Sequence, residues 1–379
     1  MIEKRSILFV TGTRADFGKL EPLALIARKA GHKVSFFVTG MHMLPGYGLT
    51  KNEVHRVPDV SVVEFLNQRE GDPQDIIFAK TVIGFSDYLK IEKPDLVVVH
   101  GDRVEAMATA LVCATNYIRC AHIEGGEVSG TIDEIFRHCN TKLAYCHFVS
   151  SQTARRRVVA MGETEESVYV IGSPELDTHS ASSGVTMEQV CERYAIPFED
   201  YGIAVFHPVT SEAENMGQQA ADLFGALVDS GRNFVVIRPN NDPGSAAILD
   251  VIATLPAARF RVLPSMRFTH FSELMRNASV IIGNSSTGVR EAPFLGIPSL
   301  DIGTRQTNRA LSSSVFQALA SNRTAILTFL RDTWNMPFPA SPEFGEGRAA
   351  ENFIATLSEP GFWTQSLQKN FIDPSEGQT

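Results

Sequence analysis

Residues 120–137 have the sequence CAHIEGGEVSGTIDEIFR, which passes from a strand pattern into a helix pattern. The apolar run before Glu124 is typical of a strand buried on both faces of a parallel sheet. Glu124 would then lie at the carboxyl end of that strand, where open α/β sheets bind their ligands. Asp133 and Arg137 would share one face of the helix that follows. The stretch therefore predicts an α/β fold with its chemistry at the strand ends.

A second carboxylate occupies the same kind of position. Asp102 follows the apolar run Leu96–His100 and would also lie at a strand end. Carboxylates that converge on one site repel one another and lose solvent, which pushes their pKa values apart. Asp102, Glu124 and Asp133 are therefore candidate acid and base groups.

Short β-rich runs alternate with helical patterns along the chain. The predicted strands are Ser6–Thr11, Lys33–Thr39, Leu96–His100, Arg119–Ile123, His147–Ser150, Val168–Ile171, Gly202–His207, Asn233–Arg238, Phe260–Leu263, Val280–Gly283 and Ser299–Asp301. The predicted helices include Leu20–Lys29, Asp75–Lys90, Val104–Asn116 and Asp133–Ala144. Such alternation indicates parallel sheets with crossover helices.

The length of 379 residues exceeds what one core normally organises. Residues Gly172–Thr186 are rich in Gly, Ser, Pro and Thr, and we interpret them as an interdomain linker. We therefore expect a doubly wound N-terminal domain at 1–175 and a second at 176–360, with their strand ends facing each other across a cleft.

The tail at 361–379 is expected to pack back onto the N-terminal domain. A helix is predicted at Arg348–Leu357, with Pro360 and Gly361 breaking the pattern after it. A further helical segment is predicted at Gln365–Phe371.

The composition excludes several classes of protein. A net charge of -9 argues against a protein that binds nucleic acid by neutralising phosphates. No apolar stretch approaches the roughly 20 residues of a membrane helix. The five cysteines form no CxxC pair, which argues against a disulfide framework or a zinc ribbon and favours the reducing cytoplasm.

The segment Thr11–Lys19 is a candidate anion site. A strand ends, a turn of small residues follows, and a helix is predicted to begin near Lys19. Free backbone N–H groups at a helix start attract anions, and Arg14 and Lys19 add positive charge. The alternative is a first βα turn whose charges are simply solvated. The spacing alone leaves both interpretations open.

The segment Gly283–Pro293 is a second candidate and better suits a diphosphate. Ser285 and Ser286 lie where a strand gives way to a helix, so hydroxyl and N–H groups could surround phosphate oxygens without a metal. Glu291 could accept hydrogen bonds from sugar or ribose hydroxyls. The alternative is an N-cap cluster in which Ser285 or Ser286 only satisfies helix donors.

Other polar residues also follow predicted strands. His207 could donate to a phosphate or polarise a leaving group, although a lone histidine is more often structural. Arg238 is a candidate phosphate ligand, and Arg305 and Asn308 could reach the same cleft. His100 and His122 are interpreted as supports for the adjacent carboxylates Asp102 and Glu124. Together these features indicate a nucleotide-sugar between the domains, with its diphosphate on the second and its sugar on the first.

Five segments resemble the UDP-N-acetylglucosamine 2-epimerases. They are GTRADFGKL at Gly12–Leu20, HGDR at His100–Arg103, HIEGGEVSGTIDE at His122–Glu134, HPVT at His207–Thr210 and GNSSTGVREAP at Gly283–Pro293. The resemblance runs over nearly the whole chain in the same order. The GGEVSGTID segment is similar to the hydrolysing branch, which begins the synthesis of sialic acid and related nonulosonates.

This resemblance implies a GT-B fold of two Rossmann-like domains in a homo-oligomer, expected to be a dimer. It implies conversion of UDP-GlcNAc and water to ManNAc and UDP, without a metal or NAD, as in capsule and sialic acid synthesis. The catalytic carboxylates would be Asp102, Glu124 and Asp133, although Glu134 adjoins Asp133 and either could face the cleft. The remaining matched positions are Arg137 near the sugar or phosphates, Phe271 near uracil, and Arg14, Lys19, His207, Ser285, Ser286, Glu291 and Arg305 around UDP.

The sequence is also compatible with other functions. A non-hydrolysing 2-epimerase would return UDP to the glucal intermediate instead of adding water. A GT-B glycosyltransferase would need an acceptor, and a nucleotide-sugar sensor would bind UDP without turnover. Some relatives act on a 2,4-diacetamido-2,4,6-trideoxy sugar of the legionaminic acid pathway, whose substituents would meet loops such as Met41–Gly48 or Val128–Thr131. A pocket that reads a hydroxyl strongly rejects an analogue without it.

Overall fold

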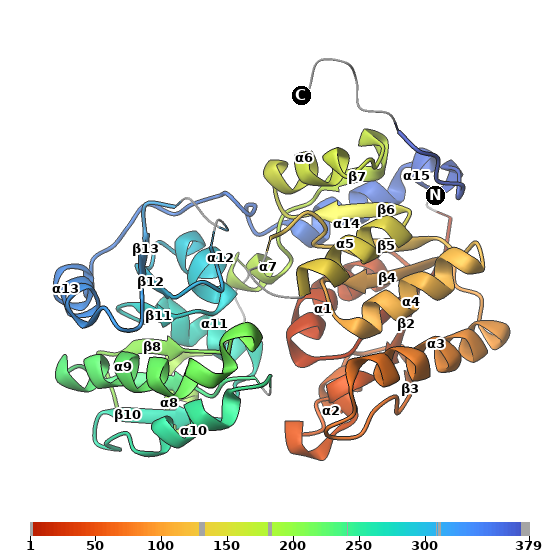
Figure 1. Ribbon diagram of the computed structural model, residues 1–379. Helices are drawn as coiled ribbons and strands as arrows, with labels where there is room; N and C mark the ends of the chain where they lie inside the picture. Colours follow the sequence, from red (N-terminus) through yellow and green to blue (C-terminus); the bar gives the residue numbers. More distant parts are fainter. Residues whose placement is uncertain are drawn as a thin grey trace. The chain divides into compact units, whose positions relative to one another are not determined.

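The computed structural model describes residues 3–128, 133–180, 184–240, 242–307, 309 and 312–372. The chain forms two compact units (Figure 1). Among the described residues, the first contains 3–127, 133–177 and 345–372. The second contains Thr178–Phe344.

The first unit is built on a seven-stranded parallel sheet with the order β3-β2-β1-β4-β5-β6-β7. Its strands are β1 Ser6–Thr11, β2 Lys33–Val38, β3 Ser61–Glu64, β4 Leu96–His100, β5 Cys120–Ile123, β6 Cys146–Val149 and β7 Val168–Val170. Its α-helices are α1 Arg14–Lys29, α2 Lys51–Val54, α3 Gln74–Ile91, α4 Val104–Thr115, α5 Asp133–Leu143, α6 Gln152–Ala160, α14 Ala349–Ser358 and α15 Pro360–Thr364, and the short 3₁₀ segments are η1 Gly40–Met43, η2 Pro45–Tyr47 and η3 Glu165–Ser167. The order reverses between β1 and β4, which is where such sheets bind ligands.

Both faces of this sheet are covered, as the continuous apolar strands predict. Ile7 and Phe9 of β1 pack on one face against residues of α1 and α14. Leu8 and Val10 point to the opposite face and pack with residues of α3 and α4. The alternation follows from the two-residue period of a strand, and it fixes the carboxyl ends of the strands between two helical layers.

The second unit has a six-stranded parallel sheet with the order β10-β9-β8-β11-β12-β13. Its strands are β8 Gly202–Val205, β9 Phe234–Ile237, β10 Phe260–Leu263, β11 Ile281–Gly283, β12 Ser299–Ile302 and β13 Val315–Ala318. Its helices are α8 Met187–Tyr194, α9 Met216–Asp229, α10 Ser245–Ala253, α11 Phe268–Arg276, α12 Ser286–Phe294 and α13 Arg323–Thr333, with η4 Thr210–Asn215 before α9. Helix α7, Glu175–Ser180, crosses from the first unit into the second. The strand order reverses between β8 and β11.

All the strands predicted from the sequence are present, and no end differs by more than two residues. Strands β3 and β13 were not predicted. Each lies at the edge of its sheet, and their burial patterns are largely exposed or intermediate, so they lack a continuous apolar run. Edge strands bury less surface and therefore carry a weaker apolar pattern.

The prediction that a helix begins near Lys19 is wrong. Helix α1 begins at Arg14, because Thr13 and Asp16 form a capping box at its start. Gly18 and Pro22 both lie inside the helix, and both obscured the pattern. The helix predicted at Gln365–Phe371 is also absent, and a short helix, α15, begins instead at Pro360. Proline suits the first turn of a helix, where no intrahelical N–H bond is lost.

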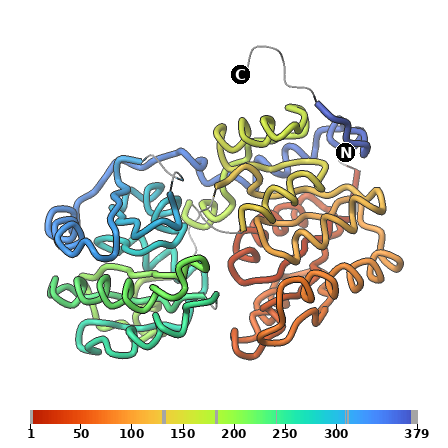
Figure 2. Tube along the Cα trace, in the orientation of Figure 1, coloured from red at the N-terminus to blue at the C-terminus, as the bar shows by residue number. Residues whose placement is uncertain are grey.

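The segment from Gly345 to Ile372 lies with the first unit, where the dark blue part of the tube in Figure 2 returns to it. Phe353 of α14 is fully buried, and its ring centroid lies 4.8 Å from that of Phe148. The carboxylate of Asp177 accepts hydrogen bonds from the N–H groups of Ala349 and Ala350 at the start of α14, at 2.8 and 2.7 Å. The second unit therefore ends at Phe344, before the predicted limit of residue 360.

The tail beyond α14 has further contacts in the first unit. Arg119 donates to the carbonyls of Trp363 and Gln365, both at 3.0 Å. The amine of Lys369 donates to three carbonyls at the end of α5, those of Thr141, Lys142 and Ala144. Within the described ranges, no helix is long and apolar enough to cross a bilayer.

Candidate functional site

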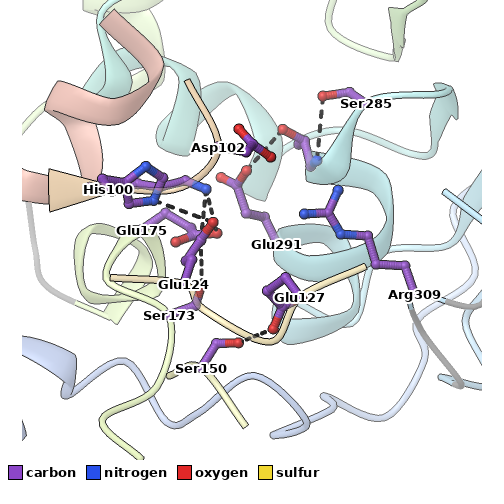
Figure 3. A network of polar contacts seen from close by, with 12 residues as sticks. His100, Asp102, Glu124, Glu127, Ser150, Ser173, Glu175, Ser285, Glu291 and Arg309 are labelled. Atoms are coloured by element: carbon purple, nitrogen blue, oxygen red, sulfur yellow. Dashed lines mark hydrogen bonds and ion pairs between the residues drawn. The ribbon is translucent and has the colours of Figure 1, made fainter. Parts of the chain in front are cut away.

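Glu124 lies directly after β5, with its side chain buried (Figure 3). One carboxylate oxygen, Oε1, accepts a hydrogen bond from Lys19 Nζ at 2.8 Å, and Ser173 Oγ lies 3.5 Å from the same oxygen. The other oxygen, Oε2, lies 3.3 Å from His100 Nε2. Residues from β4, α1 and the loop after β7 therefore fix this carboxylate.

The backbone of Glu124 adopts φ 67°, in the left-handed region that non-glycine residues rarely enter. Such a conformation costs of order 1–3 kcal/mol and clusters at functional sites. Gly125 and Gly126 continue the turn, and a Cβ at Gly126 would overlap the carbonyl of Ala154. The turn thus aims Glu124 at the sheet end at the expense of local backbone strain.

Arg137 of α5 joins the two strand-end carboxylates. Its guanidinium forms an ion pair with Asp102 Oδ2, donates to the carbonyl of Glu124 at 2.9 Å, and lies 3.8 Å from Glu124 Oε2. The Arg137 and Glu124 side chains are each 3% exposed, whereas that of Asp102 is 23% exposed. Asp102 is therefore the more accessible of the two carboxylates.

Two hydrogen bonds fix the carbonyl group of Gly101, the residue before Asp102. The carbonyl of Gly101 accepts hydrogen bonds from His122 Nε2 at 2.7 Å and from Asn140 at 2.9 Å. Nδ1 of His122 lies 3.2 Å from the hydroxyl of Thr141. Since Nε2 must carry the proton to donate to a carbonyl, Nδ1 accepts from the threonine.

These contacts correct the expectation that each histidine supports the carboxylate next to it in sequence. His100 precedes Asp102 but contacts Glu124, and His122 precedes Glu124 but binds the carbonyl before Asp102. The exchange follows from the parallel register, in which His100 pairs with Ile123 and Val99 with His122. Side chains on neighbouring strands are closer than those two residues further along one strand.

In the second unit, Asn284 joins the ends of three strands. Its side chain accepts from the N–H of His207 at 2.6 Å and donates to the His207 carbonyl at 2.8 Å. Its own carbonyl accepts from Arg305 at 3.1 Å and from Gln306 at 2.9 Å. Gly283, at φ 135°, allows the close approach, because a Cβ there would overlap the Val205 carbonyl.

His207 presents a neutral donor at this strand end. Burial and the nearby Arg305 lower the pKa of His207 to about 3. Its Nδ1 accepts from the N–H of Asn240 at 3.1 Å, so Nε2 carries the proton. A neutral imidazole with a fixed N–H can donate to an anionic oxygen.

Helix α12 begins beside this group. Ser285 is its N-cap and accepts from the N–H of Thr287 at 3.4 Å, and Ser286 is its first residue. Thr287 donates to Glu291 Oε1 at 2.9 Å, and His179 bonds Glu291 Oε2 at 2.6 Å. Figure 3 shows Ser285 and Glu291 on this helix. The helix start and the His207–Asn284–Arg305 group together suit an anion with neighbouring hydroxyls.

Comparison with known proteins identifies the family of this chain. The family model of UDP-N-acetylglucosamine 2-epimerase matches residues 25–358. The chain belongs to the UDP-N-acetylglucosamine 2-epimerase family. The UDP-N-acetylglucosamine 2-epimerase of Neisseria meningitidis serogroup B is 41% identical over 373 residues, which cover 97% of this chain and 99% of that protein.

A second sequence relative and a solved structure are also similar to this epimerase. The hydrolysing UDP-N,N'-diacetylbacillosamine 2-epimerase of Legionella pneumophila is 31% identical over 96% of this chain and 98% of its own. A crystal structure of a UDP-GlcNAc 2-epimerase from Neisseria meningitidis bound to UDP-GlcNAc has a TM-score of 0.77 at 18% identity, covering 93% of this chain and 99% of that one. The fold is that of the GT-B class, with two parallel α/β domains.

The segment Thr11–Lys19, predicted to bind an anion, has other contacts in the structure. The carboxylate of Asp16 accepts from the N–H groups of Gly12 and Thr13, at 3.0 and 3.1 Å, so these donors serve the helix cap. Arg14 pairs with Glu53 at 2.8 Å. Lys19 lies in the carboxylate cluster, 2.8 Å from Glu124 and 3.6 Å from Glu175. The N–H groups of Gly12 and Thr13 therefore stabilise the start of α1 and do not serve as anion donors.

The other predicted site residues occupy further positions in the two units. Asp133 begins α5 and is partly buried, whereas Glu134 lies 3.7 Å from His138 one turn later. Arg238 is exposed at the end of β9, and Phe271 packs at the margin of the core beneath α11. Among the contacts of the described residues, none joins Arg238 or Phe271 to His207. Asn308 and residues 129–132 lie outside the described residues.

Sequence reasoning missed several polar residues of the two groups. They are Asn140, Ser173, Glu175, His179, Asn284 and Asp301. Asn284 and Asp301 had a usable signal, because Asn284 directly follows β11 and Asp301 lies one residue before the end of β12. Burial raises the pKa of Asp301 to about 7, against the opposing effect of Arg305 and Arg309. Across the described residues, no group of three or more Cys, His, Asp or Glu is arranged to hold a metal ion.

The buried His122 predicts a pH-dependent stability. Burial lowers the pKa of His122 to about 3, whereas an unfolded histidine titrates near about 6.5. The folded form therefore binds fewer protons between these values, and stability falls as pH drops from about 6.5 towards 3, by up to about 1.4 kcal/mol per pH unit. His122→Gln retains a donor for Gly101 and should lack this component. Urea denaturation from pH 7 to pH 4 measures the difference, and parallel curves for the two proteins would contradict the assignment.

Proposed function

We propose that this epimerase is of the hydrolysing type and converts UDP-GlcNAc and water to ManNAc and UDP, the first step of sialic acid synthesis. The observation that carries the proposal is the pair of strand-end carboxylates, Asp102 and Glu124, joined by the buried Arg137. The 41% identical relative, named a UDP-N-acetylglucosamine 2-epimerase, supports the substrate. The GGEVSGTID segment supports the hydrolysing branch.

The chemistry requires a positioned base. The proton at C2 of the sugar has no neighbouring carbonyl carbon to acidify it, so a carboxylate must be held against it to remove it. We assign Asp102 and Glu124 to proton handling at C2 and to activation of water. Asp133 is assigned to orientation of the sugar or to a second acid and base role. Arg137 holds the first two in fixed positions, which preserves the geometry during turnover.

Loss of the C2 proton is coupled to departure of UDP from C1 on the opposite face. The C2–H electron pair forms the C1–C2 double bond of 2-acetamidoglucal, and the C1–O electron pair leaves with UDP. Addition of water at C1 and of a proton at C2 from the other face then gives ManNAc. The neutral donor His207, Arg305 and the start of α12 at Ser285 and Ser286 would stabilise the charge that develops on the diphosphate.

Further parts of the proposal rest on sequence arguments. Arg14, Lys19, Arg238 and Phe271 stay proposed ligands of the nucleotide or sugar. A homodimer is proposed from the family resemblance, and a cytoplasmic location from the unpaired cysteine pattern. The first unit would act on the sugar, and the second would bind UDP.

One alternative substrate has specific support. The Legionella relative, 31% identical over 96% of this chain, is named a hydrolysing UDP-N,N'-diacetylbacillosamine 2-epimerase. The same proton transfers and the same loss of UDP apply to a 2,4-diacetamido-2,4,6-trideoxy sugar. The two substrates differ at C4 and C6, remote from the carboxylates that act at C1 and C2.

Proton NMR of the purified enzyme with UDP-GlcNAc in D₂O, without added metal, tests the proposal. Free UDP together with ManNAc that carries deuterium at C2 is the expected result. UDP-ManNAc without release of UDP would assign the non-hydrolysing reaction instead. If the spectrum stays unchanged, the same experiment with the diacetamido sugar tests the alternative, and no reaction with either substrate would refute both.

A further inference from the structure

A chain of four buried polar side chains runs through the second unit, outside the carboxylate cluster. The hydroxyl of Ser272 on α11 lies 2.8 Å from His179 Nδ1. His179 Nε2 lies 2.6 Å from Glu291 Oε2, and Thr287 donates to Glu291 Oε1 at 2.9 Å. Ser272 and His179 are each 2% exposed, and Glu291 is 6% exposed. Sequence reasoning assigned a function to Glu291 alone.

The order serine, histidine, carboxylate is that of a nucleophilic triad. A nucleophile must be reachable by its substrate, and Ser272 is buried on α11 beside the core residues Leu274 and Met275. These hydrogen bonds therefore do not activate Ser272 as a nucleophile. Glu291 and Thr287 are less buried, at 6% and 9% exposed, so the contacts from His179 and Thr287 act on the Glu291 carboxylate.

His179 donates to Glu291 in both of its relevant protonation states. In the neutral form with the proton on Nε2, Nδ1 accepts from the hydroxyl of Ser272. In the cation, both ring nitrogens donate, and the serine hydroxyl rotates to accept. The bond to Glu291 Oε2 thus persists in either state, and together with Thr287 it fixes both oxygens of the carboxylate.

The fixed carboxylate retains capacity for a ligand. Two oxygens of an ionised carboxylate offer about four acceptor positions, of which His179 and Thr287 occupy one on each oxygen. Helical side chains lean towards the N-terminus, so the carboxylate of Glu291 lies alongside the first turn of α12, where it meets Thr287. Two acceptors beside an anion-binding helix start match two adjacent hydroxyls next to a diphosphate, as in the ribose of a nucleotide.

We propose that His179 is a positioning residue for nucleotide recognition: its hydrogen bond holds Glu291 in the orientation that accepts the two ribose hydroxyls. The inference rests on the proposed function, since it takes the ligand to be UDP. His179 lies 112 residues before Glu291 in the sequence and comes from α7, the short helix that leads into the second unit. It makes no proposed contact with the substrate itself.

Calorimetric binding of UDP and of 2′,3′-dideoxy-UDP to the full-length protein tests this role. The wild type is expected to prefer UDP. His179→Leu is expected to weaken UDP binding about tenfold, the effect of losing one hydrogen bond to a charged group, while dideoxy-UDP binding stays unchanged. His179→Gln, whose amide can donate in place of Nε2, is expected to restore the preference. General damage to the fold would weaken both ligands alike.

Thr287→Val provides an independent variant, because it removes the donor to the other carboxylate oxygen with little change of shape. It should show the same selective loss if His179→Leu does not fold. Equal loss of both ligands in these variants, or an unchanged preference, would overturn the role of His179 while turnover of UDP-GlcNAc leaves the proposed function standing. A wild type that binds neither ligand and turns over no UDP-GlcNAc would overturn both.

Discussion

Replacement of Glu124 with glutamine is expected to lower the turnover of UDP-GlcNAc by about 10²–10⁴-fold while UDP affinity changes only a few-fold. Glutamine has nearly the same shape but cannot exchange a proton with the sugar or with water. Because Lys19 and His100 approach Glu124 from the same sheet end, the amide should remain in the same place. The release of UDP and the exchange of deuterium into C2 give the rate, and calorimetry gives the affinity.

The matched control is Glu163→Gln. Glu163 is another buried glutamate of the first unit with a lysine partner, Lys142 at 2.7 Å. Although burial opposes them, His147, Lys142 and Lys369 lower the pKa of Glu163 to about 2, so this control should lose stability. Below its unfolding transition it should keep its turnover. Asp102→Asn should resemble Glu124→Gln, and near-normal turnover in either variant would remove that residue from proton handling.

The positions of the two carboxylates could be predicted because each follows a largely apolar strand that is buried along its whole length. Leu96–Val99 and Cys120–Ile123 are almost fully buried, and a polar residue directly after such a strand must lie at the edge of the sheet. The same argument placed His207 and Ser285. The alternation of strands and helices also predicted the fold class, because each pair of parallel strands needs a crossover connection. The two parallel sheets confirm it.

The partners of these residues could not be predicted, because they depend on register and on contacts between distant segments. The pairing of His100 with Glu124 crosses two strands, and that of Lys19 with Glu124 spans 105 residues. Asn140 looks like an ordinary helix residue until α5 packs beside β4. The sequence likewise does not predict that α14 packs in the core of the first unit, because its apolar face at Phe353 would fit either unit.

Replacement of Arg137 with methionine should have the largest effect on stability among these changes. The side chain is 3% exposed and balances Asp102 and Glu124 at once. Loss of one partner from a buried ion pair costs about 3–5 kcal/mol, and because Glu124 keeps Lys19 and Asp102 is partly exposed, the loss is expected at the lower end of that range. Methionine fills a similar volume, so the cavity contribution is small. Urea denaturation at pH 7 measures the loss of free energy of unfolding.

A double variant separates the charge effect from packing. If the destabilisation comes from loss of the guanidinium charge beside Asp102, Asp102→Asn should recover part of it in the Arg137→Met background while destabilising the otherwise unchanged protein. The coupling should be at least about 1 kcal/mol, since residues in one ion-pair network do not add. Additive losses would mean that Arg137 acts through packing and through its bond to the Glu124 carbonyl. Arg137→Lys keeps the charge but not the fork of donors, so it should rescue stability further than turnover, because one ammonium cannot hold both carboxylates.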